Sequence, residues 1–182
     1  MDKLKIFVAC HKPGPVYQDD IYTPIHVGRA VSKFKDEMAG MIGDDTGDSI
    51  SEKNPEYCEL TAQYWAWKNL HDVEYVGFCH YRRYFDLKIN AENVDVIFKT
   101  KDVILLDATQ VGNIDNFMLS MVSREDVTLF LMALKRLYPE YEKTTIDYLF
   151  GNRFYSNNML ICRKELFDDY ATWLFSIFVD NN

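Results

Sequence analysis

The sequence lacks paired cysteines and long apolar runs, and each absence excludes a class of protein. None of its four cysteines forms a CxxC pair, which argues against a zinc site built on paired cysteines. The apolar stretch near the N-terminus is too short for a signal peptide. No run reaches the roughly 18 apolar residues of a membrane-spanning helix. We therefore expect a cytoplasmic protein, in at most peripheral contact with the inner face of a membrane.

Positive charge is also scarce. Lys and Arg number 20 against 28 Asp and Glu, which gives a net charge of −8. A general nucleic-acid binder needs a basic face for phosphates, so nucleic acid is not expected as a partner. Aromatic residues, in contrast, are abundant at 15%. Most of them belong in the core or on the surface, but flat amphipathic rings also suit contacts with a sugar or a base.

Short apolar runs alternate with helical patterns along the 182 residues. We expect buried strands at residues 5–10, 75–79, 102–106 and 158–162. We expect helices at residues 59–70, 125–137, 141–150 and 164–179. This alternation predicts one α/β domain over residues 1–182, with a mostly parallel sheet flanked by helices.

Two connecting segments, residues 11–28 and 43–55, are rich in glycine and proline or in acidic residues, and both are predicted as loops. Asn54 is the predicted N-cap of the helix that follows, with Pro55 at its first position.

The segment HYRRYF carries the strongest candidates for chemistry, because it directly follows a predicted buried strand. Arg82 and Arg83 offer planar forks of donors that match phosphate oxygens. His80 can donate to phosphate or act as an acid or base near neutral pH, and Tyr81 lies beside it. These residues could hold the diphosphate of a nucleotide sugar. The alternative is that both arginines pair with acids on a neighbouring loop.

A second candidate segment is the loop after the first strand. His11 and Lys12 open it, and Tyr22 lies further along. A bound nucleotide needs cations for its phosphates and an aromatic face for its base, which these residues could supply. An ordinary surface loop with solvated charges is the alternative.

Acidic residues gather in the predicted loop at residues 43–55. Asp44, Asp45 and Asp48 are punctuated by glycine and could hold Mg²⁺ or Ca²⁺, although the spacing does not match an EF-hand. One carboxylate could instead orient an acceptor hydroxyl. A plain turn is the third interpretation.

Two further segments carry polar and aromatic candidates. Glu59 begins a predicted helix, where the helix dipole stabilises its ionised form, and it could act as a cap or as a base. Tyr64 and Trp65 follow on that helix and could contact sugar, or pack on the sheet. Asn157 and Asn158 precede the last strand and are either turn residues or partners for sugar hydroxyls.

Four motifs taken together resemble one known family. They are IFVACHK, Y-x-P-I-x-V-G, DDTGDSIS-x-KN-x-x-YCELTAQYWAWKN and YVGFCHYRRYF. The chain is similar to bacterial polysaccharide-biosynthesis proteins long catalogued as a domain of unknown function. Members occur in capsule, exopolysaccharide and lipopolysaccharide gene clusters, and some resemble galactofuranosyltransferases. The resemblance resumes at NNMLICRKELFDDYATWLF. Positions that match the family's motifs are His11, Lys12, Asp44, Asp45, Asn54, Tyr57, Glu59, Thr61, Tyr64, Trp65, His80, Tyr81, Arg82, Arg83, Asn158 and Met159.

The resemblance implies a GT-A-like, Rossmann-type fold and an inverting transferase that moves a sugar from a UDP-sugar, such as UDP-galactofuranose, to a surface polysaccharide. The implied partners are this nucleotide-sugar donor and a glycan or lipid-linked glycan acceptor. Asp45 and Glu59 rank equally as the base that deprotonates the acceptor, with Asp44 as a third candidate. GT-A enzymes usually hold a metal with Asp-x-Asp after a central strand. Because HYRRYF stands there instead, we expect a metal-independent site with no cofactor beyond the donor.

The chain departs from the family in two places. Relatives carry a Y-x-H-x-H segment after the third strand, where this chain has NIDNFMLSMVSREDV. Relatives also continue past the last helix, so we expect part of their C-terminal site to be missing here. These departures leave an alternative open, a non-catalytic transferase-like domain that binds a glycan or a nucleotide. A sugar-phosphate transferase is a second alternative.

Overall fold

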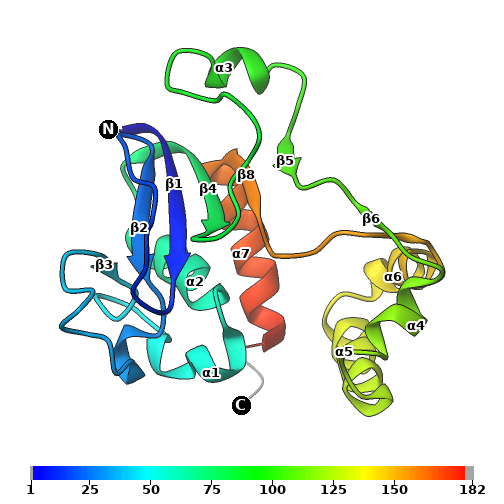
Figure 1. The fold of residues 1–182 in the computed structure, drawn as a ribbon. Helices are drawn as coiled ribbons and strands as arrows, with labels where there is room; N and C mark the ends of the chain where they lie inside the picture. The colour runs from blue at the N-terminus through cyan, green and yellow to red at the C-terminus, as the bar shows by residue number, and fades with distance from the viewer. Residues whose placement is uncertain (1, 179–182) are drawn as a thin grey trace. The chain divides into compact units, whose positions relative to one another are not determined.

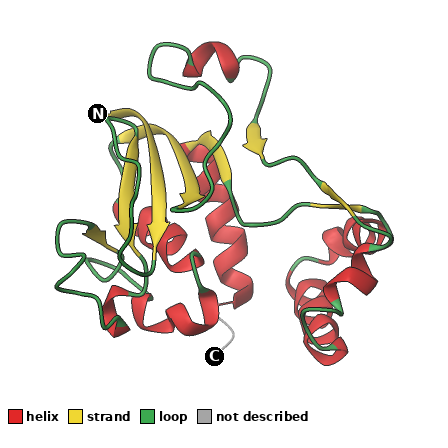
Figure 2. Cartoon of the chain, in the orientation of Figure 1, coloured by secondary structure: helices red, strands yellow, loops and turns green. Residues whose placement is uncertain are grey.

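The computed structural model describes residues 2–178, and their contacts divide them into two compact units. Unit 1 comprises residues 2–106 and 157–172, and unit 2 comprises residues 107–156 and 173–178. Unit 1 contains the larger sheet, which Figure 1 shows with its strands labelled. Unit 2 is mostly helical (Figure 2).

The sheet of unit 1 has six strands. In spatial order they are β3 (Ile42–Gly43), β2 (Tyr22–His26), β1 (Asp2–Cys10), β4 (Val73–His80), β8 (Leu160–Arg163) and β5 (Val103–Leu105). The first four run parallel, whereas β8 is antiparallel to both of its neighbours. The predicted α/β class with a mostly parallel sheet is therefore confirmed.

Both faces of β1 are buried, which explains its uninterrupted apolar sequence. On one face, Phe7 stacks on Phe78 of β4 and meets Trp65 of α2 (Leu60–Asn69) edge-on. Phe167 of α7 (Lys164–Phe178) packs on Phe78 at 5.0 Å between ring centres. On the other face, Ile6 and its alternate neighbours join the core that includes α3 (Val94–Ile97).

The predicted strands at 5–10, 75–79, 102–106 and 158–162 correspond to β1, β4, β5 and β8. The predicted helices correspond to α2, α5 (Arg124–Leu137), α6 (Glu142–Leu149) and α7. A capping box between Ser123 and Asp126 begins α5. Residue 179, the predicted end of the last helix, lies outside the described residues.

The prediction of a loop throughout residues 11–28 is wrong, because β2 lies inside it. Three prolines in this stretch hide the strand from a sequence pattern. β2 is nevertheless buried and pairs with β1 from Ile6 and Tyr22 to Cys10 and His26. The residue interval 11–21 remains outside any strand or helix.

The second predicted loop, residues 43–55, is also partly wrong. It contains the end of β3, a 3-10 turn at Ser51–Lys53 and the start of α1 (Asn54–Tyr57). Asn54 is not the N-cap, because Lys53 occupies that position. The Asn54 side chain instead donates to the Cys58 carbonyl at 2.6 Å and to Thr61 Oγ1 at 3.1 Å.

Unit 2 contains α4 (Ile114–Met118), α5, a 3-10 turn at Pro139–Tyr141, α6 and a short ribbon of β6 (Thr109–Gln110) with β7 (Arg153–Phe154). Phe117 of α4 packs on Phe154 of β7 at 5.0 Å between ring centres. Residues 113–127 form α4 and the start of α5.

Gly28 is a position where an added methyl group should be costly. Its φ is +66°, and a Cβ there would lie 2.6 Å from Asn54 Cγ. We expect Gly28→Ala to lower the free energy of unfolding by about 1–3 kcal/mol, because left-handed backbone and a clash act together. Urea denaturation measures this. Gly40→Ala, which meets no atom within 4 Å, is the control, and equal stability of both variants would contradict the expectation.

Candidate functional site

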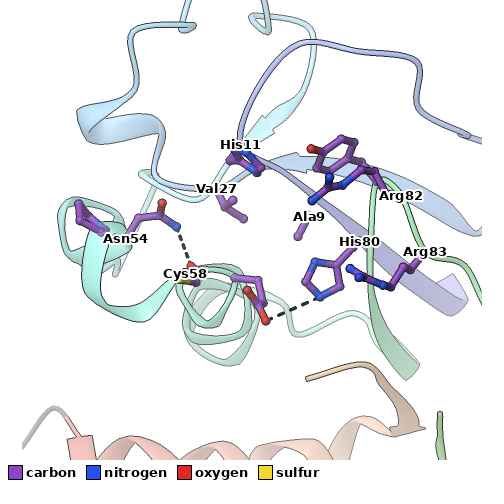
Figure 3. Close-up of a pocket in the computed structure, with 11 residues that line it drawn as sticks. Ala9, His11, Val27, Asn54, Cys58, His80, Arg82 and Arg83 are labelled. Atoms are coloured by element: carbon purple, nitrogen blue, oxygen red, sulfur yellow. Dashed lines mark hydrogen bonds and ion pairs between the residues drawn. The ribbon is translucent and has the colours of Figure 1, made fainter. Parts of the chain in front are cut away.

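A cavity of about 460 Å³ opens in unit 1 where β1 and β4 end. Both strands run in the same direction, so their carboxyl ends meet at one edge of the sheet, the usual place for ligands in such folds. The lining residues come from these strand ends, from the end of β2 and from α1 and its junction with α2. They are Ala9, His11, Val27, Asn54, Pro55, Cys58, Glu59, His80, Tyr81, Arg82 and Arg83 (Figure 3).

A tight turn at the end of β4 presents the two arginines. The Arg83 N–H donates to the His80 carbonyl at 2.9 Å, and the His80 N–H donates back to the Arg83 carbonyl at 3.2 Å. The Tyr81 N–H donates to the carbonyl of Ala9, which ties the turn to the end of β1. The turn leaves Arg82 and Arg83 exposed beside the cavity, with the Arg82 guanidinium 5.1 Å from the Tyr81 ring centre.

Neither guanidinium forms an ion pair with any residue between 2 and 178. The alternative in which Arg82 and Arg83 are neutralised by acids on a neighbouring loop is therefore wrong for this part of the chain. Their donors remain available to an anion that enters the cavity.

Glu59 and His80 lie together in the cavity, which Figure 3 marks with a dashed line. The His80 Nε2 atom is 3.7 Å from Glu59 Oε1 and 2.8 Å from the Asn157 carbonyl oxygen. Because a carbonyl only accepts, Nε2 carries the proton. The Asn158 amide donates to Glu59 Oε1 at 2.9 Å. The hydrogen bond from Asn158 thus holds the Glu59 carboxylate through one of its two oxygens.

The loop after β1 contributes one of its predicted residues to the cavity. His11 lines it and meets the Tyr81 ring edge-on at 5.5 Å. Burial lowers the pKa of His11, and the charges of Lys12, Arg82 and His80 lower it further. Lys12 itself is exposed and is not among the lining residues.

Tyr22 is not among the residues that line the cavity and belongs to an aromatic cluster with Tyr17 and Tyr84. Its ring centre is 5.5 Å from Tyr17 and 5.8 Å from Tyr84. Burial raises the pKa of Tyr22 to about 12. The cluster fixes the loop, because the Tyr84 hydroxyl also accepts the Tyr17 N–H.

The acidic loop does not converge on one point. Asp44 is fully buried, and its carboxylate accepts from the Gly28 and Arg29 N–H groups and from the hydroxyls of Ser51 and Thr61. Asp45 pairs with Arg29 at 2.6 Å. Across residues 2–178, no group of three or more His, Cys, Asp or Glu side chains is arranged to hold a metal ion.

Tyr64 and Trp65, predicted to contact sugar, are held elsewhere. The Tyr64 hydroxyl donates to Asp48 Oδ1 at 3.1 Å, and Trp65 Nε1 donates to Thr46 Oγ1 at 2.9 Å. Both side chains therefore fasten α2 to the acidic loop. Neither is among the residues that line the cavity.

Cys58 lines the cavity although its position in the sequence does not single it out as a site residue. It follows α1 with φ +50° and ψ −131°, and this break separates α1 from α2. A cysteine inside a helical pattern does not reveal such a break, because the conformation usually requires glycine. The break matters because it sets the direction in which α2 begins and so the position of Glu59.

Residues 5–182 match the model of a protein family described as a domain of unknown function, DUF4422. The chain belongs to this family. Among solved structures, this DUF4422 chain is similar to the apo structure of WbbM, described as a bifunctional glycosyltransferase, with 30% identity and a TM-score of 0.79. The match covers 98% of this chain and 37% of that one. A search of curated proteins found no match.

These comparisons confirm the family resemblance predicted from the four motifs. They also confirm that the α/β fold is like that of a glycosyltransferase structure. No helix within residues 2–178 has the length and apolarity needed to cross a membrane.

The Asp44 contacts predict a structural contribution. We expect Asp44→Asn to lower the free energy of unfolding by about 2 kcal/mol, because an amide nitrogen would then face buried donors. Asp45→Asn is the matched control, with a loss of at most about 1 kcal/mol expected from its partly exposed ion pair. Thermal and urea unfolding measure both. Equal losses, or a fully stable Asp44→Asn protein, would show that the buried carboxylate is not needed for folding.

Proposed function

We propose that this DUF4422 chain is a glycosyltransferase that moves a sugar from a UDP-sugar to a growing surface polysaccharide. The observation that carries the proposal is a cavity with two unpaired arginines on one side and a held carboxylate, Glu59, on another. The similarity to the WbbM structure supports it. Because the chain spans 37% of that protein's length, the activity remains our inference.

The cationic side of the cavity suits the diphosphate of the donor. Arg82 and Arg83 supply planar donor forks, and His11 and His80 lie beside them. When the bond between the sugar and the diphosphate breaks, negative charge grows on the leaving oxygen. Fixed cations at that place stabilise the transition state more than the ground state. They supply what a divalent metal supplies in other transferases, so we propose a metal-independent reaction.

Glu59 is our choice for the base. The Asp44 carboxylate already accepts four hydrogen bonds, and Asp45 forms an ion pair with Arg29, so neither is available as a base. Glu59 lines the cavity, and the hydrogen bond from Asn158 engages only one of its oxygens. In the proposed step, Glu59 takes the proton of the acceptor hydroxyl. The acceptor oxygen then bonds to the anomeric carbon while UDP leaves with the electron pair, which inverts the configuration.

The identity of the donor sugar and of the acceptor follows from the family resemblance. We propose UDP-galactofuranose as the donor and a glycan or lipid-linked glycan of a capsule, exopolysaccharide or lipopolysaccharide as the acceptor. An acceptor of this kind would be presented at the inner face of the cytoplasmic membrane.

Removing the arginines tests the diphosphate site. We expect Arg82→Ala with Arg83→Ala to lower kcat/KM about a hundredfold, because two stabilising cations are lost, and to weaken UDP binding. Stability should change little, since both side chains are exposed. Donor turnover and the UDP-induced rise in melting temperature measure the two effects.

Arg153→Ala, which removes an exposed arginine from β7 in unit 2, controls for the loss of positive charge. Full activity of the double variant together with a lower melting temperature would show that the arginines serve the fold.

The base is tested by Glu59→Gln, which keeps size and removes basicity. We expect kcat to fall by about 10²–10⁴ while UDP affinity is retained. The measurement is transfer to acceptor at saturating donor. If Asp45→Asn lowers kcat by this factor while Glu59→Gln stays active, Asp45 is the base and the assignment to Glu59 is wrong. A wild-type protein that binds UDP but transfers nothing would favour the non-catalytic binding domain.

A further inference from the structure

Gln63 is a buried polar residue next to the site that the proposed mechanism does not use. It lies on α2 four residues after Glu59, so the two side chains share one face of the helix. Gln63 is 1% exposed, and its Nε2 donates to the Asn158 carbonyl oxygen at 3.0 Å. Its Oε1 has no hydrogen-bond partner in the described part of the chain. Burying an amide is costly unless its polar atoms are hydrogen-bonded, so the unpartnered Oε1 carries a cost that the Nε2 bond only partly offsets.

The partner of Gln63 is an unusual turn. Asn157 has φ +73° and Asn158 has φ +49°, two consecutive left-handed residues that are not glycine. Each residue held this way costs about 1–2 kcal/mol, so the surroundings must impose the turn. Three hydrogen bonds do so, and their partners are His80 at the end of β4, Glu59 at the start of α2 and Gln63 within α2.

The three bonds connect the turn to the reacting groups. The Asn157 carbonyl accepts from His80, the Asn158 side chain donates to Glu59, and the Asn158 carbonyl accepts from Gln63. Asn158 is therefore held by α2 at two points, one through its side chain and one through its backbone. The Gln63 bond restrains the peptide unit from which the Asn158 side chain extends.

We propose that Gln63 is a positioning residue: it anchors the Asn157–Asn158 turn, which in turn fixes the Glu59 carboxylate and the His80 imidazole in the cavity. This inference rests on the proposed function, because it assigns Gln63 to the same site. It also gives Asn157 and Asn158 a role in holding the reacting residues, in place of direct sugar contact. Gln63 touches no substrate and acts only through the turn.

The chemistry of the Gln63 bond makes the proposal testable by pH. In Gln63→Glu an ionised carboxylate faces the Asn158 carbonyl with no proton to donate, so the bond becomes a repulsion. When the carboxyl is protonated, its O–H donates in place of Nε2 and the bond is restored. Burial raises the pKa of a carboxyl at such a position. The variant should thus work at acidic pH and fail as the pH rises.

The experiment compares the transfer rates of Gln63→Glu and wild type as a ratio at each pH, so that pH effects common to both proteins cancel. We expect kcat of the variant to be within about threefold of wild type near pH 6 and reduced about tenfold or more near pH 9. KM for the donor should stay unchanged, because Arg82 and Arg83 take no part in the three hydrogen bonds of the turn. Gln110→Glu, an exposed residue of β6, adds the same charge and should show a constant ratio.

A second variant and a second readout keep the outcome decisive. Asn158→Gly retains the left-handed backbone and removes the amide, and it should lower kcat at every pH. In the free protein, the ¹⁵N imidazole signals of His80 should report the Nε2–H tautomer in wild type and a mixture of tautomers in Gln63→Glu at alkaline pH.

A ratio independent of pH, or unchanged His80 signals in a folded variant, would overturn the positioning role. If the wild-type protein transfers no sugar, the proposed function fails. The His80 signals then still decide whether Gln63 holds the turn.

Discussion

The buried carboxylate of Asp44 is the constraint on which the site depends. It gathers the Gly28 and Arg29 N–H groups after β2, the Ser51 hydroxyl before α1, and the Thr61 hydroxyl in the first turn of α2. One side chain thereby ties together segments that precede and follow Glu59 in the sequence. The same arrangement presses Asn54 against Gly28, where only glycine leaves room. A carboxylate can be retained without access to water because four donors supply its hydrogen bonds.

Local charge in the cavity opposes the charge of the whole chain. The protein carries −8, yet two arginines and one carboxylate are the fully charged groups that line its cavity. Exposed guanidinium groups without acidic partners do not destabilise the fold, because water solvates them. They remain free to exchange that water for phosphate oxygens, whereas arginines already paired with acids would first have to break those bonds. The lowered pKa of His11 fits the same picture, because burial next to cations disfavours a further positive charge.

The sequence predicts the core of this fold better than its site. Apolar runs such as 5–10 and 75–79 predict strands because both faces of these strands are buried, whereas Pro24 breaks the pattern of a strand and hides β2. HYRRYF predicts a site because a polar cluster directly after a buried strand must emerge at the sheet edge. Spacing could not rank Asp45 against Glu59. Their difference arises from partners distant in sequence, Arg29 for one and Asn158 for the other.

Backbone strain in the described chain is concentrated around the cavity. The non-glycine residues with positive φ between positions 2 and 178 are Cys58, Asn157 and Asn158. Cys58 sets the start of α2 just before Glu59, and the two asparagines hold Glu59 and His80 from the opposite side. Strained conformations persist only where surrounding contacts over-determine them. A carboxylate and an imidazole held from both sides need little reorganisation when charge moves during a reaction. This preorganisation offsets the free-energy cost of the strained backbone on either side of Glu59.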